Sequence, residues 1–148
     1  MGRTDEIRRE VVLPAPIERV WDAVTDPIEL SMWFGDIAEI DLRPGGEAKF
    51  GWSAYGDAFE AVVVEVDRPC KFSYRWASQS NTPYDESTAR LVEMTLEPLD
   101  SGTRLTMVES GFTKLTGDGY QRAIDANSGG WDSELADLIT YLAVDTGG

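Results

Sequence analysis

Two charged residues, Arg9 and Glu109, stand in segments whose other positions on the same face are apolar. Arg9 shares one face of its segment with Ile7 and Val11, and Glu109 shares a face with Leu105. A charge that remains buried is usually paired. If the two segments are neighbouring strands, the sequence favours an Arg9–Glu109 salt bridge. The alternatives are a polar anchor for a ligand carboxylate or hydroxyl, and side chains that both face solvent.

A second group of candidate binding residues is aromatic. Inward-facing aromatic residues mostly pack in cores, but a set this rich also suits the walls of a cavity for a planar or apolar ligand. Met94 and Met107 alternate with polar residues in strand-like segments and are candidates for the same lining. The aromatic candidates are Trp33, Phe34, Phe50, Trp52, Phe59, Tyr74, Trp76 and Trp131.

Two adjacent glycines, Gly129 and Gly130, interrupt a C-terminal segment (residues 119–143) whose apolar residues recur at helical spacing. Each glycine costs a helix roughly 1 kcal/mol relative to alanine. The pair therefore indicates either a break into two helices or a bare helix surface that another backbone or a ligand approaches closely.

Polar residues surround these glycines. Asn127 lies about one helical turn before Trp131, where it is either satisfied locally or forms the hydrogen-bonding end of a ligand site. Asp132 and Glu134 are expected to be solvated helix residues.

The absent residue types narrow the chemistry. The 148 residues include no histidine and one cysteine, Cys70, so histidine-based nucleophile systems, histidine metal sites and an internal disulfide are excluded. We assign no catalytic residue, metal or cofactor; an enzyme would need a carboxylate of raised pKa, such as Glu109, or Tyr74. The formal net charge of −14 argues against nucleic acid and anionic membranes as partners. The first residues form no apolar signal stretch, so a cytoplasmic location is expected.

The elements that must position these residues follow from turns and periodicity. Pro and Gly clusters separate alternating segments, which predicts an antiparallel, strongly curved sheet of about seven strands. Two short helices are expected after the first strand, and Asp26-Pro27 separates them. We expect a single α+β domain over residues 1–148, with strands at 7–13, 37–42, 47–52, 57–67, 71–76, 88–99 and 103–110.

Several short motifs, weak singly but in a characteristic order, resemble those of a known superfamily. The pattern is similar to the SRPBCC or START-like superfamily with its helix-grip fold, and most resembles the C-terminal-domain family of the activator of heat-shock protein ninety ATPase. The resemblance runs from about Arg9 to Leu142. Its motifs are Ala15-Pro16, Val20-Trp21, Thr25-Asp26-Pro27, Trp33-Phe34, Pro44-Gly45-Gly46, Gly102-Thr103-Arg104-Leu105, Glu109-Ser110-Gly111-Phe112 and Gly130-Trp131.

This resemblance implies a fold rather than one activity. It implies that the first and last strands are neighbours and that a cavity lies between the curved sheet and the C-terminal helix. Relatives often carry a histidine shortly before the Gly-Trp pair, where this chain has Ala126-Asn127-Ser128, so histidine-dependent chemistry does not carry over.

We expect a small-molecule binding protein that holds an apolar or aromatic ligand in this cavity. One alternative is a partner-binding accessory protein similar to a chaperone regulator. The other is a cofactor-independent cyclase or hydrolase that uses a carboxylate in the cavity. A monomer and a homodimer are both compatible with the sequence.

Overall fold

A seven-stranded sheet with the strand order β1-β7-β6-β5-β4-β3-β2 forms the framework, and every neighbouring pair is antiparallel. The structure, a computed structural model, describes residues 5–114 and 118–145. The strands are β1 (Glu6–Leu13), β2 (Ile37–Ile40), β3 (Glu47–Trp52), β4 (Asp57–Asp67), β5 (Lys71–Trp76), β6 (Arg90–Leu99) and β7 (Gly102–Ser110). The helices are α1 (Ile17–Thr25), α2 (Pro27–Trp33) and α3 (Asp118–Asp145), with 3-10 turns η1 (Ser53–Tyr55) and η2 (Phe112–Lys114).

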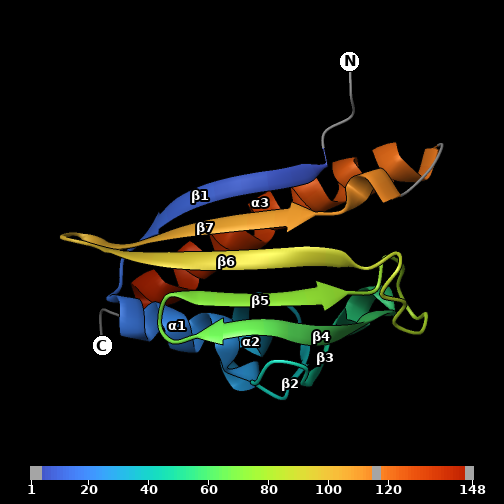
Figure 1. The fold of residues 1–148 in the computed structure, drawn as a ribbon. Helices are drawn as coiled ribbons and strands as arrows, with labels where there is room; N and C mark the ends of the chain where they lie inside the picture. The colour runs from blue at the N-terminus through green and yellow to red at the C-terminus, as the bar shows by residue number, and fades with distance from the viewer. Residues whose placement is uncertain (1–4, 115–117, 146–148) are drawn as a thin grey trace.

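The helices lie on one face of the sheet, with the long helix α3 running along the strands (Figure 1). This arrangement confirms the predicted helix-grip architecture, and most element ends agree with the sequence pattern to within two residues. Within the described residues, no helix is both long and apolar enough to cross a bilayer.

Alternation along the central strands sends one set of side chains towards α3. In β7 every second residue from Thr103 to Glu109 is buried, and in β6 the same holds from Arg90 to Leu96. The register sets Val92 opposite Glu109. The pleat therefore delivers two charged side chains, Arg90 and Glu109, to the interior face of adjacent strands.

The junction of the two short helices is fixed locally. Asp26 ends α1 and also caps α2, because its side chain accepts a hydrogen bond of 2.9 Å from the Ile28 backbone N–H. Pro27 occupies the first turn of α2, as the sequence predicts. The Trp33 indole N–H donates to the Ala23 carbonyl oxygen at 2.8 Å and ties α2 to α1. This junction places Phe34, the residue after α2, over the sheet.

The C-terminal helix α3 is continuous, so the first of the two alternatives for its glycines, a break into two helices, does not occur. The expected approach of another backbone is absent as well, since a Cβ built on Gly129 or Gly130 would meet no atom of the described chain within 4 Å, its own helix backbone aside. Leu135, Leu138 and Leu142 anchor the helix on the core and are at most 2% exposed. Gly130 therefore faces open space above the sheet.

Candidate functional site

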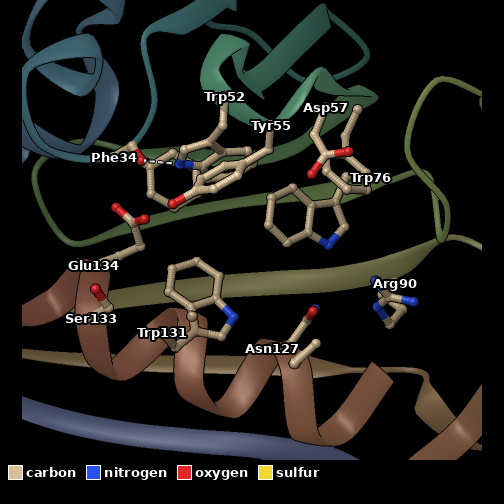
Figure 2. A pocket seen from close by; sticks show the side chains of 13 residues that line it. Phe34, Trp52, Tyr55, Asp57, Trp76, Arg90, Asn127, Trp131, Ser133 and Glu134 are labelled. Carbon is tan, nitrogen blue, oxygen red and sulfur yellow. Dashed lines mark hydrogen bonds between the residues drawn. The ribbon is translucent and has the colours of Figure 1, made fainter. Parts of the chain in front are cut away.

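A pocket of about 380 Å³ lies between α3 and the β3, β4 and β5 strands (Figure 2). Helix α3 provides one wall through Ala126, Asn127, Gly130, Trp131, Ser133 and Glu134. The sheet and its connections provide the rest through Phe34, Trp52, Tyr55, Asp57, Phe59, Trp76 and Arg90. Pockets of roughly 300–1,000 Å³ with mostly aromatic walls and a few polar groups are typical of small-molecule sites.

The aromatic side chains contact one another and form a continuous surface. Phe34 stacks at 5.6 Å on Trp131 and at 6.3 Å on Trp76, measured between ring centroids. Its backbone carbonyl oxygen accepts a hydrogen bond of 2.6 Å from the Trp52 indole N–H, drawn as a dashed line in Figure 2. Phe59 lies 5.6 Å from Trp76 on the strand side. These contacts fix the ring positions before any ligand arrives.

Glu109 lies beneath this surface, fully buried, and four side chains donate hydrogen bonds to its carboxylate. Trp76 Nε1 and Arg90 Nε donate to Oε2 at 2.8 and 3.0 Å, and Trp131 Nε1 donates to Oε1 at 2.9 Å. Asn127 Nδ2 contacts the two oxygens at 2.9 and 3.1 Å. One carboxylate therefore joins β5, β6 and β7 to α3 and sets the orientation of both indole rings.

The expected salt bridge between Arg9 and Glu109 is not formed. Arg9 Nε pairs with Asp132 Oδ1 on α3 at 2.6 Å, while Glu109 pairs with Arg90, whose side chain is only 5% exposed. The physical reason is position in the sheet. Arg9 lies on the edge strand β1 opposite Met107, and it reaches outward to a partly solvated acid. Arg90 enters from an interior strand and supplies the buried charge that Glu109 requires.

The expectation that Glu134 is a solvated helix residue is wrong, because its side chain lines the pocket and is half-buried. Its Oε2 atom is buried and has no hydrogen-bond partner in the described chain. Burial, with a smaller contribution from the negative charge of Asp137, raises the pKa of Glu134 to about 7. The nearby Trp52 indole opposes part of this shift. The Trp52 N–H donates to the Phe34 carbonyl oxygen at 2.6 Å and lies near the Glu134 carboxylate as well.

With this geometry established, the family can be identified. The family model of Activator of Hsp90 ATPase homolog 1-like protein matches residues 14–143, a span that includes the whole pocket lining. The chain belongs to this family. No curated protein matches the sequence.

Several solved structures share the fold of this member of the Activator of Hsp90 ATPase homolog 1-like family. Protein MLL2253 from Mesorhizobium loti is 23% identical, with a TM-score of 0.79 over 93% of this chain and 96% of that chain. The Aha1 dimer from Colwellia psychrerythraea is 18% identical, with a TM-score of 0.76 over 94% and 96% of the two chains. DynU16, a protein in the dynemicin biosynthetic locus, is 25% identical, with a TM-score of 0.77 over 95% of this chain and 48% of that chain.

The structure of this family member divides the site residues expected from the sequence into three groups. The pocket lining includes Phe34, Trp52, Phe59, Trp76, Asn127 and Trp131. The hydrophobic core includes Trp33, Phe50, Tyr74, Met94 and Met107. Glu109 lies beneath the pocket, and Arg9 lies between β1 and α3. Burial, followed by the negative charge of Glu109, raises the pKa of Tyr74 well above its usual range, so Tyr74 stays protonated at neutral pH.

Four ionisable residues of the pocket lining were not among the sequence candidates: Tyr55, Asp57, Arg90 and Glu134. Helical spacing carried a signal for Glu134, which lies three residues after Trp131 and seven after Asn127 on the same face of α3. Strand alternation carried a signal for Arg90, which has the same parity as the inward-facing Val92. Strand alternation also carried a signal for Asp57, which has the same parity as the candidate Phe59. Tyr55 lies in a turn, and no periodic pattern marks it.

The raised pKa of Glu134 predicts a pH-dependent effect of Glu134→Gln. The pKa of about 7 lies above the ordinary value of 4.5. Between these values the native state holds a proton that the unfolded chain releases, so the stability of the wild type falls as pH rises from about 4.5 to 7. Glutamine removes this loss. We expect the variant to gain about 1 kcal/mol at about pH 8, because water screens part of the cost for a half-buried side chain.

Urea unfolding of wild type and variant at about pH 4.5 and 8 measures this gain. The gain should nearly vanish at the lower pH, where the carboxyl group is protonated in the native state. An equal difference between the two proteins at both pH values would show that Glu134 does not titrate in this range.

Proposed function

We propose that this protein binds a small apolar or aromatic molecule in the pocket between α3 and the sheet. The observation that carries the proposal is a pocket of about 380 Å³ whose walls are aromatic and whose two central indoles, Trp76 and Trp131, are fixed from below by Glu109. Rings held in place by buried hydrogen bonds lose little freedom when a ligand arrives, which favours affinity.

The bare helix surface at Gly130 supports this proposal. Gly130 lines the pocket, and a Cβ at this position would extend into open space instead of filling a gap in the core. A glycine in the middle of a helix is unfavourable for folding. Its presence is accounted for if a ligand occupies the space above it.

Binding accounts for the site better than catalysis by Glu109 or Tyr74. The oxygens of Glu109 accept hydrogen bonds from four donors, which leaves this carboxylate poorly placed to take a proton from a substrate. Tyr74 lies in the core outside the pocket lining and stays protonated. The link of DynU16 to a biosynthetic locus further associates this fold with small-molecule chemistry.

Native mass spectrometry of gently purified protein, followed by extraction under denaturing conditions, tests the proposal. We expect a co-purified apolar molecule, or a rise in melting temperature with members of a library of neutral aromatic compounds. An empty protein whose melting temperature no compound raises would contradict a binding role. In that case a protein partner, the alternative function, would be sought by affinity capture.

A further inference from the structure

The charged side chains of the pocket differ in whether they already have partners of opposite charge within the protein. Arg90 is neutralised, because its Nε bonds Glu109 at 3.0 Å, its second guanidinium nitrogen bonds the Ser78 carbonyl oxygen at 3.3 Å, and the group lies 5.0 Å from the centre of the Phe112 ring. The other charged residues of the lining are Asp57 and Glu134, both acids. The pocket therefore offers a ligand negative charge and no free positive charge among its described residues.

One oxygen of Glu134 lacks a hydrogen-bond partner in the described chain. Its Oε2 atom is buried and accepts no hydrogen bond within the described chain, although nearly all buried polar atoms in proteins find one. In Figure 2 this carboxylate lies on the α3 wall, across from Trp52 and Tyr55. A bound molecule with an N–H donor at this place would satisfy the oxygen, and a positively charged donor would bind it most strongly.

We propose that the ligand class of this pocket is an aromatic or apolar molecule that carries a protonated amine, with the ammonium group at Glu134 and the apolar part against Trp76 and Trp131. The inference rests on the proposed function and adds the charge of the ligand. The face of Trp52 offers a further attraction to a cation. The net charge of −14 favours the approach of cations and disfavours anions.

The protonation of Glu134 links this recognition to pH. Near pH 7 part of the empty protein carries a protonated Glu134, and a bound ammonium group favours the ionised form. Binding of an amine should therefore release about half a proton per site near neutral pH, and affinity should fall as the solution is acidified. Asp137 on α3 is the charged group that acts on Glu134, and Asp57, Tyr55 and Arg90 are the other ionisable residues of the pocket lining.

Three naphthalene probes of one shape test the proposal by calorimetric titration: 1-naphthylmethylamine, 1-naphthalenemethanol and 1-naphthoate. At about pH 8 we expect the amine to bind about tenfold more tightly than the alcohol, and the carboxylate more weakly than both. At about pH 5.5 the advantage of the amine should shrink to about twofold. Titration of the amine at about pH 7, in two buffers of different ionisation enthalpy, measures the expected release of about half a proton.

Two variants separate the role of Glu134 from a general charge effect. Glu134→Gln should bring the amine to the affinity that the alcohol has for the same variant and abolish proton release. Asp132→Asn, which removes the same charge from the exposed side of the same helix, should keep the amine preference.

A failure of this inference and a failure of the proposed binding function give different results. If the alcohol or the carboxylate binds as tightly as the amine at about pH 8, the charge of the ligand is wrong. If Glu134→Gln keeps the amine preference, the placement of the ammonium group at Glu134 is wrong. In both cases the binding function stands. If none of the three probes binds, the proposed function itself fails and this inference fails with it.

Discussion

Replacing Glu109 by alanine should lower the free energy of unfolding by about 3–5 kcal/mol. This is the largest stability effect that we expect for a buried polar residue among those the structure describes. The substitution leaves the buried guanidinium of Arg90 without its counter-ion. It also leaves Trp76, Trp131 and Asn127 without an acceptor for their donor groups. Buried donors that lose their only acceptor cost far more than the bond itself contributes.

Urea unfolding monitored by tryptophan fluorescence measures this loss. Glu97→Ala is the matched control, because Glu97 pairs with Arg104 across two strands of the same sheet but both side chains are about half exposed; it should cost less than about 1 kcal/mol.

A double variant tests the cause of the loss at Glu109. Glu109→Gln combined with Arg90→Met removes both buried charges together. The double variant should be more stable than the sum of the two single changes predicts.

A loss of stability in Glu109→Ala as small as that in Glu97→Ala would contradict the role of the Glu109 carboxylate in holding the site together.

Replacing Gly130 by leucine should weaken binding of 1-naphthalenemethanol by at least about tenfold while the fold is retained. The new side chain would extend from α3 into the pocket, where a Cβ meets no atom of the described chain within 4 Å. A leucine is also a better helix former than glycine, so the helix is not weakened. The measurement is a calorimetric titration, with thermal unfolding as the check on folding.

Gly129→Leu is the control for this experiment. Gly129 is adjacent in the same helix and equally free of contacts for a Cβ, but it does not line the pocket. The helix-propensity gain should therefore be similar in both variants and the loss of affinity confined to Gly130→Leu. Equal affinity in the two variants would place the ligand elsewhere.

The order of the strands and helices could be read from the sequence because each boundary is set by local chemistry. Asp26-Pro27 ends one helix and begins the next, and the hairpin turn at residues 100–102 joins β6 to β7 as expected. The course of α3 could not be read in the same way. Two glycines disfavour a helix locally, but packing of Trp131, Leu135 and Leu138 on the core overrides that preference.

The partner of Glu109 could not be predicted, because two arginines on inward faces compete for it. Arg9 lies two residues along the sheet from Glu109 on one side, and Arg90 lies at a similar offset on the other. What decides between them is the acid at Asp132, which pairs with Arg9 at the open edge of the sheet. That contact depends on how α3 sits on β1, and local sequence patterns do not record it.

Glu134 was missed for a different reason. Acidic residues on an amphipathic helix usually face water, and this expectation held for Asp132 but not for Glu134, which faces the opening above Gly130. A cavity leaves inward-facing positions unfilled, so a polar residue can occupy one without entering the core. Alternation marked the aromatic candidates as inward-facing but did not say which of them border the cavity, because residues of both groups are buried.

A ¹H–¹⁵N titration with 1-naphthalenemethanol tests whether a ligand binds in the pocket between α3 and the sheet. The signals to follow are the indole N–H resonances of the five tryptophans. Trp52, Trp76 and Trp131 line the pocket, whereas Trp21 and Trp33 lie in the core outside its lining, so each spectrum carries its own control. Single Trp→Phe variants assign the signals. We expect saturable shifts of the three pocket resonances, with the other two nearly unchanged. Pocket resonances that stay in place at saturating probe, or shifts confined to Trp21 and Trp33, would contradict it.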